Sequence, residues 1–470
     1  MTRPFAILGA AALVFAAALA GPSAQTQPAA TSDDALVKRA RGIHERALTL
    51  DTHDDISPAN FTPERNYTQD LPTQVNLPKM VAGGLDAAFF IVYVGQGQLT
   101  PEGFDDAYKQ AVAKFDAVHL LTGKIAPDKI ELALTAADVR RIHKAGKKVA
   151  LIGVENGYSL GDASTAIKRV KEFHDRGARY LSLAHNGHSQ LADSNNGEAS
   201  GTWAHNGLSE LGKQVVAELN RVGIMVDLSH PSKAANLQAI GLSKAPVIAS
   251  HSSARALCDH SRNMDDELLL ALKKNGGVVQ AVALASYVKT PPPPTAERLA
   301  ALTKLEEEFG LPTGSLGRGG RGGGGRGAAP AAGAGQAGRA GGAPAGGGRG
   351  RGGALAQLSE EKRAEAQKRL DDINATFPPP PRANVTDFVD HIDYIVKKIG
   401  IDHVGISSDF DGGGGVDGWN DASETFNVTL ELVRRGYTEE QIGKIWSGNL
   451  LRVWAEVEKV ARQIQSGQMK

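Results

Sequence analysis

Short apolar runs alternate with amphipathic stretches along most of the chain. Residues 85–94 form an almost unbroken apolar run next to glycines, which is typical of a strand buried on both faces. Ala166, Val170 and Phe173 recur at helical spacing, and Gly177 ends that stretch. Eight strands are predicted in this way, and they begin near residues 48, 86, 148, 179, 224, 246, 277 and 402. Helical patterns separate most of them.

Eight strand–helix units predict an α/β protein of the (β/α)8 TIM-barrel type, formed by one domain over residues 34–470. A doubly wound open sheet is the alternative, and it would place its functional groups at a single crevice. In this chain polar residues follow many different strands, which favours a closed ring.

Groups suited to metal binding or proton transfer stand where these strands end. In residues 48–55 (LTLDTHDD) an apolar lead-in runs into His53 and Asp55, which share one face of a strand because alternate side chains point the same way. Later strands are followed by Glu155, His185, His230, His251 and Asp409. Each alone has an ordinary explanation, such as a loop histidine or a salt-bridged glutamate. Because the carboxyl ends of barrel strands converge on one mouth, together they predict a site.

The types of residue in this set restrict its chemistry. The chain has a single cysteine, Cys258, so an intrachain disulfide and a cysteine-based zinc site are both excluded. Histidine with Asp and Glu suits zinc or a similar divalent ion in a hydrolytic site. Two such ions, roughly 3.5–4 Å apart, would need a bridging carboxylate and could hold a hydroxide between them. A carboxylate that binds no metal could then transfer protons.

Net charge, the N-terminal segment and one low-complexity segment bear on the partners and the location of the protein. The 470 residues carry no formal net charge, so no basic field predicts nucleic acid as a partner. Residues 1–24 resemble a signal peptide, with Arg3 before an apolar core, and predict a secreted or periplasmic protein; an uncleaved anchor is the alternative. Residues 313–353, between the last two predicted strands, are nearly all Gly, Ala and Arg and are predicted to be disordered. A flexible loop explains them; contact of their arginines with an anionic polymer is the sharper alternative.

Several short motifs resemble the membrane dipeptidase (renal dipeptidase, M19 peptidase) family of the amidohydrolase superfamily. They are DTHDD at 51–55, GVENG at 153–157, SLAH at 182–185, DLSH at 227–230, SHSSA at 250–254, SRN at 261–263, SDFDG at 408–412 and GNLLRV at 448–453. Their order is that of the family, and apart from the insert the resemblance spans about residues 47–455.

The resemblance implies a barrel of the metal-dependent hydrolase type that holds two zinc ions. His53 and Asp55 would bind one zinc ion, and His230 and His251 would bind the other. Glu155 would bridge the two, in the place where related amidohydrolases often use a carbamylated lysine.

The resemblance also implies the roles of three further residues. His185 would polarise the scissile carbonyl or hold the oxyanion. Arg262 would bind the C-terminal carboxylate of the substrate, a task that suits a planar bidentate donor. Asp409 would take the proton from the bridging hydroxide and pass it to the leaving amine. A homodimer is implied in the same way.

The implied function is a zinc dipeptidase, which the family pattern extends to dipeptides with a D-residue at the C-terminal side. The alternatives are another amidohydrolase acting on a cyclic amide, lactone or β-lactam, and a non-catalytic binding protein with an incomplete metal shell. Three positions depart from the family pattern, since Asp54 stands where Asn is common, Ser57 where Pro is common and Asn156 where Gly is common. None of the three is an implied ligand.

Overall fold

The structure, a computed structural model, describes residues 33–316 and 354–469. The predicted signal peptide and most of the predicted insert lie outside these residues. The strands are β1 (Leu50–Asp55), β2 (Ala87–Tyr93), β3 (Ile130–Leu132), β4 (Lys148–Glu155), β5 (Ala178–Ser182), β6 (Met225–Asp227), β7 (Ile248–Ala249), β8 (Val278–Val282) and β9 (Val404–Ser407).

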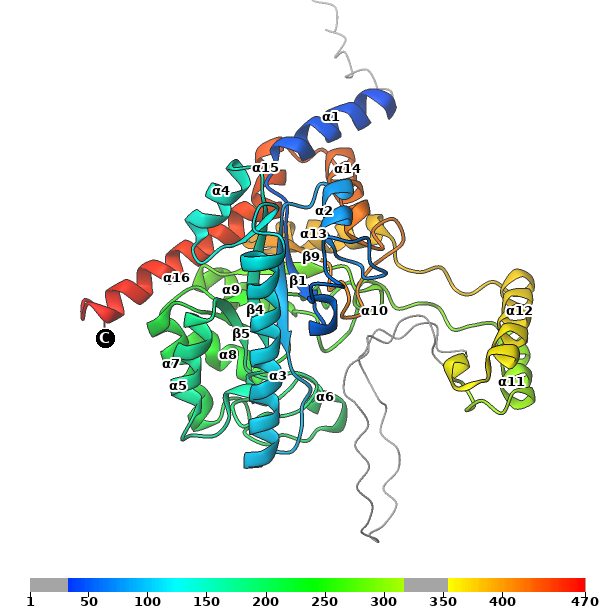
Figure 1. Cartoon of the computed structure of the whole chain (residues 1–470), viewed down its shortest axis with the longest axis horizontal. Coiled ribbons are helices and arrows are strands. Elements are labelled where there is room, and N and C mark those ends of the chain that lie inside the picture. Colours follow the sequence, from blue (N-terminus) through cyan, green and yellow to red (C-terminus); the bar gives the residue numbers. More distant parts are fainter. Residues whose placement is uncertain (1–32, 317–353, 470) are drawn as a thin grey trace, which may run out of the picture.

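The α-helices that the structure describes lie mostly around the outside of these strands (Figure 1). They are α1 (Asp33–Arg46), α2 (Leu77–Gly83), α3 (Pro101–Leu120), α4 (Ala136–Lys144), α5 (Ala166–Asp175), α6 (Gly197–Ser200), α7 (Glu210–Val222), α8 (Lys233–Leu242), α9 (Asp266–Asn275), α10 (Ala285–Val288), α11 (Ala296–Glu308), α12 (Glu360–Thr376), α13 (Val385–Ile399), α14 (Phe426–Arg434), α15 (Glu439–Gly443) and α16 (Asn449–Gln465). Among the described residues, no helix is long and apolar enough to cross a membrane.

The sheet is a parallel barrel, which confirms the predicted fold. Its order is β1-β2-β4-β5-β6-β7-β8-β9, and every pair along it is parallel. The ring closes between its first and last strands, where the Asp55 amide donates to the Phe410 carbonyl (2.8 Å) and the Ser408 amide donates to the Asp51 carboxylate (2.9 Å). All eight barrel strands were predicted; β3, which pairs with β4 beside the ring, was not.

Alternate side chains of the strands enter two separate apolar cores. One set lies against the surrounding helices: Ala88, Phe90, Val92, Ala150, Ile152, Val154, Leu181, Val226, Val279, Ala281, Val404 and Ile406. The other set fills the barrel: Leu50, Ala87, Phe89, Ile91, Val149, Leu151, Tyr180, Met225, Ile248 and Val278. Both faces are buried, so the strands read as continuous apolar runs rather than alternating ones. The inner core also contains one face of α16, so the barrel is apolar at the end that this helix covers.

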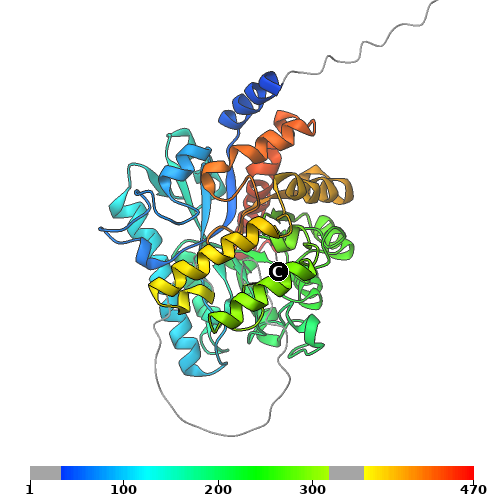
Figure 2. The same ribbon diagram turned by 90° about the vertical axis from the view of Figure 1, so that its right-hand side faces the viewer.

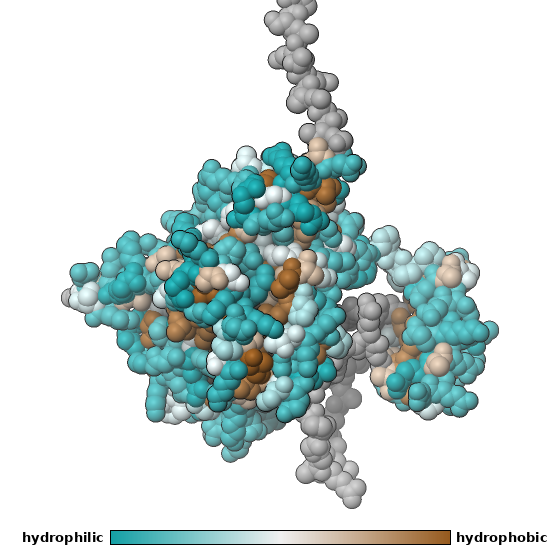
Figure 3. All heavy atoms as spheres, turned by 45° about the horizontal axis from the view of Figure 1, so that its top comes forward, coloured by the Kyte–Doolittle hydropathy of each residue, from teal (hydrophilic) through white to brown (hydrophobic). Residues whose placement is uncertain are grey.

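Helices α11 and α12 form an arm that stands clear of the barrel in Figure 1; in Figure 2 the two helices lie side by side in front of the barrel. The arm has a small apolar cluster of its own, which includes Leu311, Leu355 and Ala366. Its outer surface is mostly hydrophilic (Figure 3). Residues 313–316, where the predicted insert begins, form a turn whose backbone amides at Gly314 (2.6 Å) and Leu316 (2.5 Å) donate to the Glu306 carboxylate. The arm therefore flanks the insert without taking part in the barrel core.

Trp454 of α16 is fully buried and packs in the inner apolar core of the barrel. We expect Trp454→Ala to lower the free energy of unfolding by about 3–5 kcal/mol, because truncation leaves a cavity under the barrel. Urea denaturation followed by circular dichroism measures this loss. Leu257→Ala, at a leucine that is 46% exposed, is the control and should change stability little. Equal effects of the two substitutions would contradict the role assigned to α16.

Candidate metal centre

The structure places all of the predicted site residues at the end of the barrel opposite α16. His53 and Asp55 lie in the last half of β1, and Glu155 is the last residue of β4. The others follow the strands directly or in the next loop: His185 after β5, His230 after β6, His251 and Arg262 after β7, and Asp409 after β9. Parallel strands deliver all of these side chains to one rim because their carboxyl ends point the same way.

Glu155 lies at the centre of this rim. Its Oε1 atom is 2.8 Å from His230 Nε2, 3.4 Å from His251 Nε2, 3.6 Å from His53 Nε2 and 3.7 Å from His185 Nε2. All of these residues except His185 are less than 5% exposed, so the carboxylate and its histidines are removed from bulk water. Such a buried carboxylate requires cationic or hydrogen-bonding neighbours.

Among the described residues, three groups of side chains are close enough to hold a metal ion, with ligand atoms within 4.8 Å of one another. They are His53, Asp55 and Glu155; Glu155, His230 and His251; and His53, His251 and Asp409. The first two are the ligand sets implied by the family resemblance, and Glu155 belongs to both. The Nε2 atom of His53 is buried and has no hydrogen-bond partner within residues 33–316 and 354–469, which suits a ligand whose lone pair faces an ion.

In the metal-free protein, burial and the attraction between opposite charges shift the pKa values of the clustered side chains. Burial by itself would raise the pKa of Glu155, but His185, His53 and His230 hold it well below its usual range. Burial would lower the pKa of His53, yet the carboxylates of Glu155, Asp409 and Asp55 raise it to about 9. Burial lowers the pKa of His185 to about 4, so its imidazole is neutral at pH 7. Burial raises the pKa of Asp409 to about 8.

The backbone turns sharply beside two of these carboxylates. Asp409 has φ 59° and Asn156, directly after Glu155, has φ 76°, values that non-glycine residues rarely adopt. Asn is among the side chains that tolerate this region best, which explains why it can stand where the family commonly has Gly. At Gly412 a Cβ atom would lie 2.4 Å from Asp55 Oδ2 and 2.6 Å from Asp409 Oδ1, so the glycine of the SDFDG motif makes room for both carboxylates.

Asp54, where the family commonly has Asn, is fully buried beneath the rim. The Ser408 hydroxyl donates to its Oδ1 atom (3.3 Å). Burial, followed by the neighbouring Asp51 carboxylate, raises the pKa of Asp54 well above its usual range. This shift disfavours the ionised form of the side chain that stands in place of the amide of Asn. Ser57, where the family commonly has Pro, precedes a short 3-10 turn at residues 58–60.

Aromatic side chains that the sequence analysis did not single out complete the rim. Tyr93, the last residue of β2, packs on His185 with 4.6 Å between ring centroids, and Lys114 of α3 lies 5.4 Å from the same tyrosine ring. Tyr287 supports Arg262, whose Cζ atom is 5.5 Å from its ring centroid. Tyr93 could have been predicted, because it ends a barrel strand; Lys114 and Tyr287 lie on helices, where no such pattern exists.

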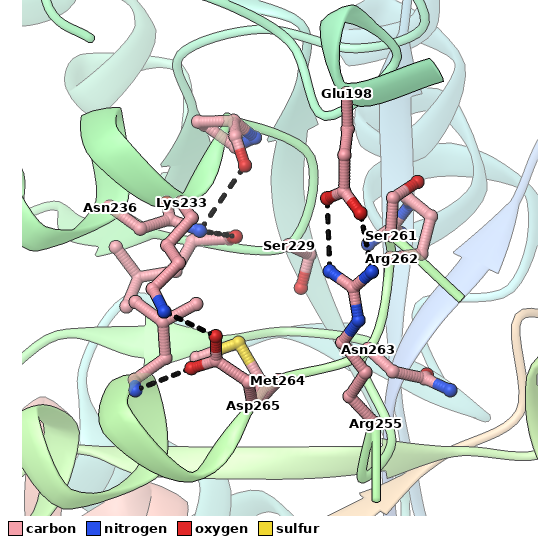
Figure 4. A pocket seen from close by; sticks show the side chains of 13 residues that line it. Glu198, Ser229, Lys233, Asn236, Arg255, Ser261, Arg262, Asn263, Met264 and Asp265 are labelled. Carbon is pink, nitrogen blue, oxygen red and sulfur yellow. Dashed lines mark hydrogen bonds and ion pairs between the residues drawn. The ribbon is translucent and has the colours of Figure 1, made fainter. Parts of the chain in front are cut away.

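Arg262 connects the metal-ligand cluster to a cavity behind it. Its Nη2 atom is 3.0 Å from His230 Nε2, and Nη1 is 3.4 Å from Ser252 Oγ. The cavity lies beside Arg262, where Arg255 forms an ion pair with Glu198 (Figure 4). None of the four histidines around Glu155 lines this cavity, so the metal centre is defined by the side-chain cluster rather than by the cavity.

Comparisons with known proteins agree with this geometry. The family model of membrane dipeptidases (peptidase family M19) matches residues 37–468. The dipeptidase tcpJ of Claviceps purpurea is 31% identical over 402 residues, which cover 84% of this chain and 72% of the relative. The dipeptidase aclJ of Aspergillus oryzae is 30% identical over 411 residues, which cover 86% of this chain and 74% of the relative.

Solved structures of dipeptidases have the same fold. The probable dipeptidase PvdM from Pseudomonas aeruginosa matches with a TM-score of 0.69 and 32% identity, covering 91% of this chain and 99% of that one. The dipeptidase AC, a metallo peptidase of family M19, shares the fold with a TM-score of 0.60 at 21% identity, covering 87% of this chain and 98% of that one. The chain belongs to the membrane dipeptidase family, peptidase family M19, and is a metallo-dipeptidase.

Proposed function

We propose that the protein is a binuclear zinc dipeptidase, which hydrolyses dipeptides with a free C-terminal carboxylate. The observation that carries this proposal is that Glu155 belongs to two adjacent groups of possible metal ligands. In the proposed centre His53 and Asp55 would hold one ion, His230 and His251 would hold the other, and Glu155 would be shared by both. Zinc suits a site of nitrogen and carboxylate ligands without cysteine. When bound, the two ions would supply Lewis acidity and lower the pKa of water.

The side chains around these ligands perform the remaining steps of the proposed reaction. Asp409, whose Oδ1 atom lies 3.8 Å from His53 Nε2, would accept the proton of the attacking water in its ionised form and return it to the leaving amine. Bound metal cations would favour that ionised form against the raised pKa of Asp409 in the metal-free protein. His185 stays neutral because burial lowers its pKa, so it donates a hydrogen bond to the carbonyl oxygen of the substrate without adding charge. Both side chains lie beside Glu155, where the scissile bond would be placed.

Arg262 is proposed to recognise the substrate carboxylate. Its side chain is buried, and among the described residues its Nε atom has no hydrogen-bond partner. A guanidinium group with this unpartnered N–H, supported on one side by Tyr287, suits the planar geometry of a carboxylate. Dipeptides with a D-residue at the C-terminal side remain part of the proposal, as do homodimer formation and export directed by residues 1–24.

A dipeptide library tests the proposed function. We expect the purified protein to cleave a subset of free dipeptides, to lose this activity after chelation and to regain it when zinc is returned. The matched substrates are the same dipeptides with an amidated C-terminus, which should be cleaved poorly because Arg262 has no carboxylate to bind. Activity that persists after exhaustive chelation, or equal cleavage of the amides, would contradict the proposal. Cleavage of a cyclic amide or lactone in preference to dipeptides would favour the alternative amidohydrolase.

Replacement of Asp409 tests the proton-transfer role. We expect Asp409→Asn to retain both zinc ions and to reduce kcat by about 100-fold or more, because the amide cannot accept a proton. Metal analysis and steady-state kinetics on the same preparation measure both quantities. Asp402→Asn is the control, since Asp402 is a largely exposed acid on the surface. A variant that lost zinc but kept its rate per bound metal would show that Asp409 is a ligand instead.

The raised pKa of His53 predicts how metal uptake depends on pH. Below about pH 9 the metal-free protein carries His53 as an imidazolium, because nearby carboxylates outweigh the effect of burial. A zinc ligand must be deprotonated, so uptake has to release this proton. We therefore expect zinc affinity to increase as the pH rises from about 6.5 to about 9. Competition with a chelator of known affinity measures this trend, and calorimetry in two buffers measures the released proton. An affinity independent of pH would contradict the assignment.

A further inference from the structure

The nitrogen of His53 that faces away from the metal centre has a defined partner inside the barrel. His53 Nδ1 is 2.9 Å from the hydroxyl oxygen of Tyr180, and that oxygen is 3.0 Å from the carbonyl oxygen of Thr52. A carbonyl oxygen only accepts, and a phenol has one proton, so Tyr180 donates to Thr52. The hydroxyl oxygen can then only accept from His53 Nδ1–H. In this tautomer the lone pair of the neutral ring is on Nε2, which points at Glu155 and Asp409.

His251 is held by a different pair of side chains. Its Nδ1 atom is 2.8 Å from Ser250 Oγ, which is in turn 2.8 Å from Asp227 Oδ2. The Ser250 hydroxyl donates its one proton to Asp227, so its oxygen accepts from His251 Nδ1–H. Asp227 is itself fixed, because backbone amides of Ser250 (2.7 Å) and Ser229 (3.2 Å) donate to its other oxygen. The lone pair of His251 is therefore also on Nε2.

The protein makes room for Tyr180 in particular. Tyr180 is the middle residue of β5 and is fully buried within the barrel. On the neighbouring strand, a Cβ atom at Gly153 would lie only 2.2 Å from Cζ of the Tyr180 ring. Gly153 opens the GVENG motif that ends in the turn after Glu155, so the same motif supplies the central carboxylate and the space for the tyrosine. His230, in contrast, has a buried Nδ1 atom without a hydrogen-bond partner.

We propose that Tyr180 and the Ser250–Asp227 pair are positioning residues, which direct the Nε2 lone pairs of His53 and His251 toward two separate metal positions. The inference rests on the proposed metal roles of these two histidines. Hydrogen bonds of this kind fix the ring orientation and tautomer of a metal ligand, and their loss typically costs about 10- to 100-fold in metal affinity. In the part of the chain that the structure describes, Tyr180 is hydrogen-bonded to His53 and not to His251, and Ser250 is hydrogen-bonded to His251 and not to His53. Because the Ser250 hydroxyl also lies near the Tyr180 hydroxyl, each variant is examined at both histidines.

The test combines zinc affinity with the imidazole protons of the ligands. We expect Tyr180→Phe to weaken one of the two zinc ions by about 10- to 100-fold in a chelator competition, and Ser250→Ala to weaken the other by a similar factor. In zinc-loaded protein labelled with nitrogen-15 histidine, Tyr180→Phe should displace the Nδ1–H signal of His53 and leave that of His251 near its wild-type position. Ser250→Ala should do the reverse.

Three controls separate positioning from folding. Tyr158→Phe removes another tyrosine hydroxyl, which donates to the Gln98 carbonyl (2.6 Å) away from the histidines, and should leave zinc affinity unchanged. Ser250→Thr keeps the hydroxyl and should restore much of the affinity lost in Ser250→Ala. Thermal melts identify any variant that fails to fold, in which case the remaining variant decides the matter for its own histidine.

The outcomes distinguish this inference from the proposed function. Wild-type protein that takes up no zinc would overturn the proposed function together with the inference. Wild-type protein that binds two zinc ions, with Tyr180→Phe and Ser250→Ala binding them equally well and with unchanged Nδ1–H signals, would overturn the inference alone. Selective weakening of one ion in each variant, with the matching shift of one histidine signal, would support it.

Discussion

One carboxylate oxygen, Oε1 of Glu155, lies within 4 Å of four histidine nitrogens, and the rest of the structure has to make that convergence possible. The four histidines come from the ends of four different strands, and no short segment of chain could bring them together. A charged group in so buried a position is costly unless neighbours of opposite or polarisable character surround it. The parallel barrel provides those neighbours because every strand delivers its last side chains to the same rim.

The two ends of the barrel interior differ in composition, and one contributes to stability while the other carries the reacting groups. Toward the strand beginnings the interior is apolar and is covered by α16, while toward the strand ends it is lined by titratable groups with perturbed pKa values. The left-handed backbone at Asn156 and Asp409 lies at the second end, directly beside the reacting groups. Strained positions of this kind persist only where surrounding structure holds them, and the closed ring of hydrogen bonds between β1 and β9 supplies that support at Asp409.

The arm formed by α11 and α12 shows how much the barrel tolerates outside this region. It follows β8 and the short α10 and has its own small apolar cluster, and its described side chains belong to neither the inner nor the outer core of the barrel. Loops at the strand ends of a barrel are the usual place for such additions, because they alter the surroundings of the site without disturbing the pairing of strands.

The sequence by itself determined the eight barrel strands and the histidine, aspartate and glutamate residues of the rim. Both follow from local patterns, since continuous apolar runs mark strands buried on two faces and polar residues at their ends must meet in a closed barrel. The family resemblance added roles for these residues, and the comparisons establish the family. Only the tertiary structure revealed Tyr180, Ser250 and Asp227 as partners of the histidines. Within the sequence they read as ordinary members of strands and their ends, because hydrogen bonds such as that from His53 to Tyr180 join residues 127 positions apart and depend on strand register and side-chain direction.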